Sequence, residues 1–453
     1  MSYQAITNAK IVTSKEIVEG AIVFGEDGRI AETGANVDWT RYAVDQVYDA
    51  GGAYALPGGI DAHVHLGGFG EIAIADDFYH GTCAALAGGT TTVMDFCEPA
   101  RGVEPLTCIR KRKEEAKHAV ADYAFHFVLT EDYRKQLEQM ERIEAEGIRD
   151  FKLFTTYENT TLGLDDICSI FSFFRKRARK TGRSYTFLVH AEDDALISAN
   201  IRKNSNQKEM IYLAETRPVE AERKAVREIR ELAVRFGVQV CIAHVSAGSI
   251  AEECSEGEAG DVFRETCPHY LEFDENRLLG KQAALYTMIP PLRRDEERQI
   301  LWEKVKDGTV SMLSTDHCPY LLRDKMGKTY RTVPCGVDGI QTRMVYLYSE
   351  GVVRRGLSMK DYVKLTSENA ARFYHLYPQK GALLAGSDAD LVILSPDGST
   401  TCSVRNSFGA IDYSIYEGKK LNGSIVAVFK NGKRVYDKDG LHVIAGQGND
   451  LKK

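Results

Sequence analysis

Apolar residues in this 453-residue chain follow one pattern in the middle and another at the two ends. In the middle, short apolar runs alternate with longer segments whose apolar residues have helical spacing. Such alternation is typical of a parallel sheet whose strands are joined by helices. The runs are GGIDAHVHL (58–66), TTTVMDF (90–96), AFHFVL (124–129), DFKLFTTY (150–157), YTFLVHAE (185–192), VQVCIAHVS (238–246), VFRETCPHY (262–270) and VSMLSTDH (310–317).

The number of these runs favours a closed barrel. Helices are expected at 76–87, 221–236 and 296–306, and the polar segment 203–217 is expected to form part of a connection. Eight strands alternating with helices predict an α/β fold, a (β/α)8 TIM-like barrel. An open doubly wound sheet is the second choice, because no Gly-x-Gly-x-x-Gly motif follows an early strand.

The two ends of the chain have the texture of antiparallel sheet. Residues 3–34 contain short β-rich runs broken by Asn, Gly and Asp, and residues 386–440 repeat that pattern. The Asn-Gly pair in FKNGKRV (429–435) is a good hairpin signal. We therefore expect the ends to meet in a small β-sandwich domain. The predicted division is 1–52 and 381–453 for that domain and 53–380 for the catalytic barrel.

Composition narrows the class of protein. The chain is 43% hydrophobic and 27% charged, ordinary values for a globular protein, and its formal net charge of −7 argues against nucleic-acid or anionic-membrane partners. No apolar run is long enough to span a bilayer, and the start lacks the pattern of a signal peptide. Ten scattered cysteines favour reduced thiols. We expect a cytoplasmic protein.

Side chains that carry chemistry lie at the ends of the apolar runs. His63 and His65 are two residues apart, so in a strand they point to the same face, although such a pair alone is weak evidence for a metal. Four further runs add a candidate each: Lys152, His190, His244 and Asp316. Singly, each has an ordinary explanation as a core or capping residue. Because the carboxyl ends of barrel strands meet at one mouth, the joint pattern predicts a metal site.

Neighbouring residues are assigned smaller roles. His126 and His269 are expected to be structural or to support the ligands, and His317 is expected to point to the opposite face from Asp316. Tyr157 follows Lys152 by five residues, which places it past the strand end, on a mouth loop. There its phenol can donate a hydrogen bond to an oxyanion.

The chain resembles the cyclic amidohydrolases, the dihydropyrimidinase and hydantoinase family within the metal-dependent amidohydrolase superfamily. The resemblance covers almost the whole chain. Its motifs include LPGGIDAHVHL, DDFYHGTCAALAGGTTTVMDF, FKLFTTY, HAED, HVS, ETCPHYLEFD, PPLRRDEERQILWEKVKDGTVSMLSTDHCPY, GIQTRMVYLYSEGV, LYPQKGALLAGSDADLVIL and SIYEGKKLNGSIVAVFKNGKRV.

The resemblance implies two divalent metal ions, usually Zn2+, bridged by a CO2-derived carbamate on Lys152 (N6-carboxylysine). It assigns two sets of ligands: His63, His65 and Asp316 for one ion, and His190 and His244 for the other. The chemistry is consistent, because burial lowers the pKa of a lysine and only a neutral amine adds CO2. The resulting anion has two oxygens with which to span two cations.

The implied reaction opens a dihydropyrimidine or hydantoin ring to an N-carbamoyl amino acid. A bridging hydroxide is the nucleophile, and Asp316 acts as general base and then acid. Tyr157 stabilises the oxyanion. Backbone groups around Ile289 and Cys335 bind the cyclic amide, although the family commonly has Ser and Asn at those positions.

The substrate is less sharply indicated than the family. The segment LGGFGEIAI (66–74), expected to line the pocket of the ring substituent, departs from the usual Glu-x-Pro-Phe. Gly67 stands where dihydroorotases usually have Arg, which argues against dihydroorotate, whereas ETCPHY leaves allantoinase as an alternative. A non-catalytic scaffold of this family is the alternative of another class, disfavoured because all six ligands are present. The resemblance implies a homotetramer, or a homodimer.

Overall fold

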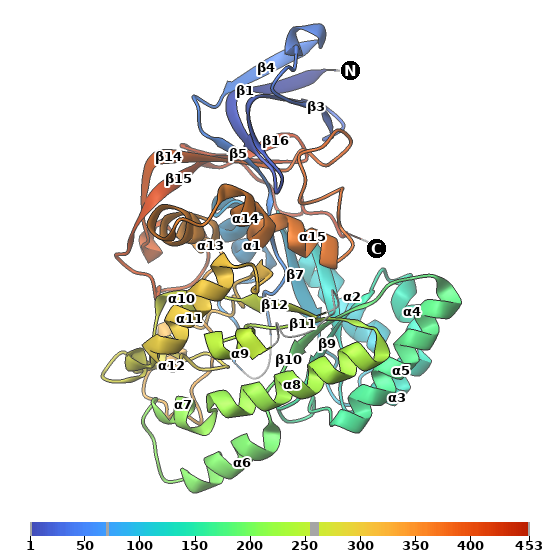
Figure 1. The fold of residues 1–453 in the computed structure, drawn as a ribbon, viewed down its shortest axis with the longest axis vertical. Coiled ribbons are helices and arrows are strands. Elements are labelled where there is room, and N and C mark those ends of the chain that lie inside the picture. Colours follow the sequence, from blue (N-terminus) through green and yellow to red (C-terminus); the bar gives the residue numbers. More distant parts are fainter. Residues whose placement is uncertain (1, 69–71, 254–261, 452–453) are drawn as a thin grey trace.

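The computed structural model describes residues 2–68, 72–253 and 262–451, and the description below concerns these residues. A parallel sheet in chain order, β6 to β13, forms the centre of the molecule (Figure 1). Its strands are β6 (Gly59–Asp61), β7 (Thr90–Cys97), β8 (Asp122–Val128), β9 (Asp150–Phe154), β10 (Thr186–His190), β11 (Gln239–Ile242), β12 (Val262–Thr266) and β13 (Met312–Leu313).

The sheet closes just beyond its first and last strands. Val64 forms a parallel bridge with His317, and the amide of His65 donates to the carbonyl of His317 at 2.8 Å. The strand order never reverses, so the doubly wound alternative is wrong and the predicted (β/α)8 barrel is confirmed.

Helices follow most of the barrel strands and cover them. The larger ones are α1 (Phe78–Ala87), α2 (Pro105–Ala116), α5 (Leu164–Thr181), α6 (Asp194–Lys203), α8 (Val219–Phe236) and α11 (Asp295–Lys306). The three helices expected from the sequence are α1, α8 and α11. Helix α8 buries Ala225, Ile229 and Ala233 on one face, as its 3.6-residue period requires. Within 203–217 the chain forms only the short helix α7 (Tyr212–Thr216).

Shorter helical segments complete the connections. They are α3 (Tyr133–Glu138), α4 (Met140–Ala145), α9 (Gly248–Glu253), α10 (Pro268–Glu272), α12 (Leu322–Lys325), α13 (Arg343–Tyr346), α14 (Met359–Val363), α15 (Asn369–Phe373), the π-helical η4 (Leu347–Val353) and η5 (Lys364–Glu368), and the 3-10 turns η1 (Trp39–Arg41), η2 (Glu275–Leu278), η3 (Ala283–Tyr286) and η6 (Val404–Asn406).

The two ends of the chain form a second, mostly antiparallel sheet. Its strands are β1 (Tyr3–Val12), β2 (Ile17–Gly25), β3 (Ile30–Gly34), β4 (Val44–Asp49), β5 (Tyr54–Pro57), β14 (Leu391–Thr401), β15 (Lys420–Lys430), β16 (Lys433–Asp437) and β17 (Gly440–Leu441). The rings of Phe24 in β2 and Phe429 in β15 lie 5.8 Å apart, although three strands separate β2 from β15 in the sheet order. The sheet therefore curls around its own apolar core.

A buried charge cluster joins this small domain to the barrel. Lys380 donates hydrogen bonds to Asp122, the first residue of β8, and to Asp390, just before β14. It also lies 2.9 Å from Asp388, and Lys430 at the end of β15 lies 2.7 Å from Asp122. These side chains are almost fully buried. They sit at the amino-terminal end of β8, away from the barrel mouth.

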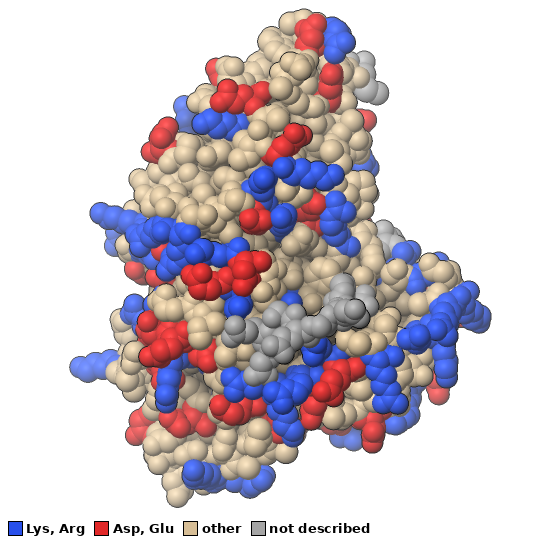
Figure 2. Space-filling view, viewed as in Figure 1, with Lys and Arg blue, Asp and Glu red and all other residues tan. Residues whose placement is uncertain are grey.

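The surface charges and the cysteine side chains show no specialised arrangement in the described ranges. On the face drawn in Figure 2, basic and acidic side chains are interspersed rather than gathered by sign. None of the helices in the described ranges has both the length and the apolar character needed to cross a membrane. The cysteines in the same ranges are free thiols.

Candidate metal centre

The barrel delivers the predicted ligands to one place. His63 and His65 lie just beyond β6, and His190 is the last residue of β10. His244 and Asp316 follow the ends of β11 and β13, whereas Lys152 lies in the middle of β9. These positions crowd polar side chains into the carboxyl end of the barrel, the end at which this fold holds its chemistry.

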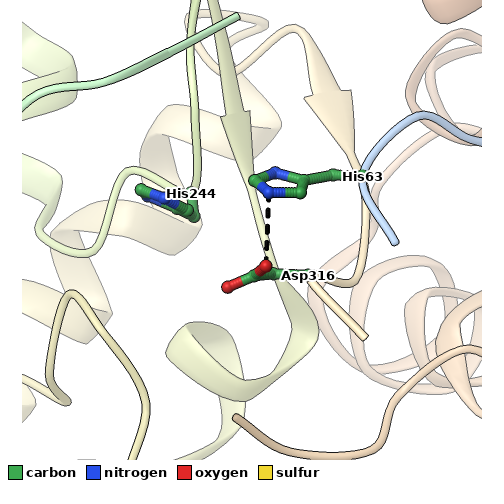
Figure 3. A group of neighbouring side chains, drawn as sticks. All are labelled: His63, His244 and Asp316. Carbon is green, nitrogen blue, oxygen red and sulfur yellow. Dashed lines mark ion pairs between the residues drawn. The ribbon is translucent and has the colours of Figure 1, made fainter. Parts of the chain in front are cut away.

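Asp316 is the contact point of the first group. Its Oδ1 lies 3.2 Å from His63 Nε2 and 3.1 Å from His65 Nε2. Figure 3 shows His63 and Asp316 joined by this contact, with His244 facing them. The side chains of His65 and Asp316 keep 15% and 13% of their surface exposed, whereas His63 keeps 1%. The group is therefore open to solvent on the side of His65 and Asp316.

His190 and His244 form the second group. His190 Nδ1 faces His244 Nε2 at 2.9 Å, and both side chains are buried. The ring of His244 lies 5.3 Å from that of His63, which brings the two groups together. One ligand atom from each of His63, His244 and Asp316 lies within 4.8 Å of the other two. This spacing brings ligand atoms of both groups around one small space.

Lys152 lies beneath these groups without a polar partner. It is 1% exposed, and no hydrogen bond to Nζ is made by any residue that the structure describes. Its ammonium instead faces the rings of Phe96 and Phe154, at 5.4 and 5.1 Å from their centroids. Burial lowers the pKa of Lys152, because the charged form loses its hydration. The neutral amine is therefore accessible near neutral pH.

Burial also keeps the ligand histidines neutral. It lowers the pKa of His63, His190 and His244, so each imidazole retains a lone pair for a cation. Burial alone would raise the pKa of Asp316, but His63 and His65 outweigh that effect and hold the pKa below its ordinary value. The carboxylate is thus anionic and ready to bind a cation.

Two buried glutamates orient the histidines, and neither was singled out in the sequence. Glu265 Oε1 lies 2.8 Å from His63 Nδ1, and Glu192 Oε2 lies 2.7 Å from His190 Nε2. Each carboxylate holds the ring nitrogen that faces away from the centre, as in metal sites of the carboxylate–histidine type. A signal was present: Glu192 follows His190 by two residues in HAED, and Glu265 interrupts an apolar run, where a buried Glu needs a partner.

The backbone is strained at several of these positions. His244, Asp316 and Tyr157 have φ angles of 37°, 48° and 96°, in the region that residues other than glycine rarely adopt. Such strain costs on the order of 1–3 kcal/mol per residue and clusters at functional sites. Here it turns each side chain inward just where its strand ends.

Tyr157 occupies the position expected for it, past the end of β9. Its ring lies 4.9 Å from that of His190, and the guanidinium of Arg217 lies 5.2 Å from its centroid. Burial raises the pKa of Tyr157, so the phenol keeps its proton at neutral pH and remains a donor. Arg217 also pairs with Glu192, which links the tyrosine to the His190 group. Arg217 is the last residue of segment 203–217, for which the sequence pattern predicted only part of a connection.

The remaining predicted residues lie around this centre or behind it. Ile289 and Cys335 pack into one apolar cluster, and burial raises the pKa of the Cys335 thiol. His269 is fully buried, and burial lowers its pKa to about 4. His126 binds the carbonyl of Ala62 at 2.9 Å.

His317 points away from the centre, as its place in the chain suggested. Its Nε2 lies 2.9 Å from Asp76 Oδ2. The segment 66–74, expected to line the substituent pocket, is only partly visible, because residues 69–71 lie outside the described part of the chain.

The donors present fit a pair of divalent ions. Four imidazoles and a carboxylate are ligands that zinc accepts, and the outward nitrogens of His63 and His190 are held by Glu265 and Glu192. The buried amine of Lys152, without a polar partner of its own among the described residues, fits a group that is modified before it binds. The arrangement can polarise a carbonyl, activate water and move a proton through Asp316.

Comparison with known proteins identifies the family of this chain. Residues 54–435 match the model of the amidohydrolase family. The chain is 34% identical to a D-hydantoinase of Geobacillus stearothermophilus over 95% of its own length and 92% of the relative's. It is 32% identical to a D-phenylhydantoinase of Escherichia coli, covering 94% and 93%. The crystal structure of dihydropyrimidinase from Brevibacillus agri superposes with a TM-score of 0.93 at 30% identity, covering 100% and 98% of the chains.

Proposed function

The chain belongs to the amidohydrolase family, in its dihydropyrimidinase and hydantoinase group, and we propose that its barrel mouth opens cyclic amides with two divalent ions held by the residues described above. The enzyme is a hydrolase of cyclic amides. The reaction we propose converts a dihydropyrimidine or a hydantoin into an N-carbamoyl amino acid.

The observation that carries this proposal is the state of Lys152. A lysine buried among aromatic rings, with its Nζ lacking a hydrogen-bond partner in the described part of the chain, is costly unless the amine is neutral or modified. The neutral amine can attack CO2 and lose a proton, which gives an anionic carbamate with two oxygens. We propose that this carbamate lies between the two groups of ligands.

We propose the division of ligands that the resemblance implies. One ion, for which we propose zinc, would be held by His63, His65 and Asp316, and a second by His190 and His244. When bound, the pair supplies Lewis-acid polarisation of the scissile carbonyl and a water of lowered pKa. Glu192 and Glu265 keep the ligand rings in the orientation that this requires.

Asp316 and Tyr157 perform the proton and charge chemistry in this proposal. The carboxylate of Asp316 is partly exposed at the mouth, so it can take a proton from the attacking water and return it to the leaving ring nitrogen. The phenol of Tyr157 retains its proton and donates to the oxygen on which negative charge develops. Backbone groups around Ile289 and Cys335 would hold the amide edge of the ring.

Gly67 supports the exclusion of dihydroorotate. Its φ is 79°, which an arginine would adopt only under strain, so this backbone does not suit a carboxylate-binding side chain at that position. The choice between dihydropyrimidine, hydantoin and allantoin depends on the substituent pocket.

We further propose that the enzyme works as a homotetramer in the cytoplasm. The support is the resemblance to the family and the free thiols of the described residues. Light scattering of the purified protein gives the mass in solution, and a monomer would contradict the assembly.

The test compares ring opening by zinc-loaded protein on dihydrouracil, hydantoin, 5-phenylhydantoin, allantoin and dihydroorotate, together with metal content. We expect turnover of dihydrouracil or the hydantoins, no turnover of dihydroorotate and two zinc ions per chain. Turnover of allantoin alone would move the substrate to the sister activity. If protein that contains metal turns over none of the five compounds, the proposal is overturned.

A further inference from the structure

Glu98 follows β7 directly, at the carboxyl end of the barrel. Along β7 the even-numbered Met94 and Phe96 belong to the cluster inside the barrel. The odd-numbered Asp95 pairs with Arg112 of α2 at 2.6 Å, and Cys97 packs in the outer cluster between barrel and helices. Side chains two residues apart in a strand share a face. Glu98 precedes a proline, which favours extended backbone, so it continues the inward series.

Phe96, the next residue inward in that series, already contacts the candidate metal centre. The ring of Phe96 stacks on His65 at 4.7 Å and lies 5.4 Å from Lys152 Nζ. Glu98 is one step nearer the opening. Burial raises the pKa of Glu98, whereas the charges of His65 and Lys152 lower that pKa. The carboxylate therefore lies within electrostatic reach of both residues.

The same corner adjoins the expected substituent pocket. The amide of Leu66, at the start of segment 66–74, donates to Asp95 Oδ2 at 2.7 Å. Arg112 ties the two strands further, donating to the carbonyls of Leu66 and Phe96. Glu98 thus follows the strand that holds Leu66, the first residue of the segment that the sequence assigns to the ring substituent.

Nothing in the described chain pairs with Glu98. Neither the hydrogen bonds nor the ion pairs of residues 2–68, 72–253 and 262–451 include its side chain. Lys152, one of the two basic residues whose charge acts on Glu98, is not a cation in the proposed function, since it carries the carbamate. A partly buried carboxylate without a hydrogen-bond donor is costly, and an ammonium group brought by a ligand would supply that donor.

We propose that Glu98 selects cyclic amides whose ring substituent carries a positive charge, such as an ω-aminoalkyl group. This inference rests on the proposed function and adds the class of substrate. The substituent's ammonium donates to the carboxylate at the mouth while the ring amide lies at the metal centre. No bond is made or broken at Glu98, so it is a specificity residue.

The test uses two substrates of equal length, 5-(4-aminobutyl)hydantoin and 5-pentylhydantoin, with wild-type protein, Glu98→Gln and Glu98→Asp. We expect wild type to favour the amine in kcat/KM by roughly tenfold or more, the scale of a charge-assisted hydrogen bond. Glu98→Gln should remove the preference and Glu98→Asp should keep part of it. The ratio cancels changes in folding or metal content. An equal ratio in wild type and Glu98→Gln would overturn the inference.

A binding measurement separates this inference from the proposed function. n-Butylammonium should raise the melting temperature of wild-type protein more than n-butanol does, and the difference should vanish in Glu98→Gln. If wild type opens neither hydantoin but shows this difference, the proposed reaction fails and the cation site stands. If n-butylammonium and n-butanol act alike on wild type, the cation site is wrong whatever the reaction.

Discussion

Two buried lysines show how the barrel mouth differs from the junction with the small sheet, at the opposite end of the barrel. Lys152 belongs to the mouth and Lys380 to the junction. Lys380 is 2% exposed and pairs with Asp122, Asp388 and Asp390. Lys152 is 1% exposed, and its Nζ has no hydrogen-bond partner among the described residues. Burial would lower the pKa of both, but at Lys380 the three carboxylates outweigh burial and raise it.

The difference shows what each buried charge is for. A lysine surrounded by carboxylates stays cationic and joins segments that are far apart in sequence, here β8 of the barrel and the start of β14. A lysine among aromatic rings is easily neutral and therefore reactive. Substitutions should consequently separate the two regions, with the mouth controlling chemistry and the junction controlling stability.

The largest expected effect is at Lys152. Lys152→Ala should abolish ring opening, because the group between the two sets of ligands is lost, while the fold is retained. Activity assays with and without short carboxylic acids check this, since such acids should partly replace the carbamate. Full activity in the variant would contradict the assignment, and wild type without added acid is the control.

The matched change at the junction is Lys380→Met. It removes the cation of Asp390 and leaves Asp122 and Asp388 with only Lys430 and Arg29. The free energy of unfolding should fall by roughly 3–5 kcal/mol, the cost of breaking a buried ion pair. Denaturant unfolding measures this loss. Ring-opening activity per folded molecule should stay near that of wild type. A variant as stable as wild type, or one that is stable but inactive, would break the comparison.

Tyr157 tests the chemistry of the mouth without removing a proposed ligand. Tyr157→Phe removes one hydrogen-bond donor and should lower kcat roughly 100- to 1000-fold, as loss of an oxyanion donor does elsewhere. Metal content should not change. Steady-state kinetics beside metal analysis makes the distinction, and an unchanged kcat would remove Tyr157 from the mechanism.

A smaller effect is expected at Glu192. Glu192→Gln keeps the shape but weakens the hold on His190 and should reduce metal affinity or activity roughly 10- to 100-fold. Titration with a competing chelator measures the affinity. The change in unfolding free energy should be smaller than for Lys380→Met. The reverse ranking would mean that Glu192 is a structural residue like those of the junction.

Much of the fold and the ligand set could be predicted from local sequence. Each barrel strand is a short apolar run that can be recognised without knowing its neighbours. The parallel order then follows from the alternation with helices. His63, His190 and His244 stand at run ends, and the geometry of a barrel brings such ends together. The role of each ligand came from resemblance and stays a prediction.

Other features depend on contacts between residues far apart in the chain. Glu265 meets His63 from 202 positions away, and Lys380 meets Asp122 from 258. The curl of the terminal sheet also depends on such contacts. The domain boundaries depend on them too, and the boundaries given from the sequence stay predictions. Sequence patterns show that a residue is polar in an apolar run but not which partner satisfies it.

The sequence by itself determined the strands, their order and the positions from which ligands project, because side-chain alternation and strand ends are local properties. Only the tertiary structure decided the partners of the buried charges. Glu192 and Arg217 are paired with each other, whereas the Nζ of Lys152 has no hydrogen-bond partner among the described residues. The physical reason is that desolvation and pairing depend on three-dimensional neighbours, which local sequence patterns do not give.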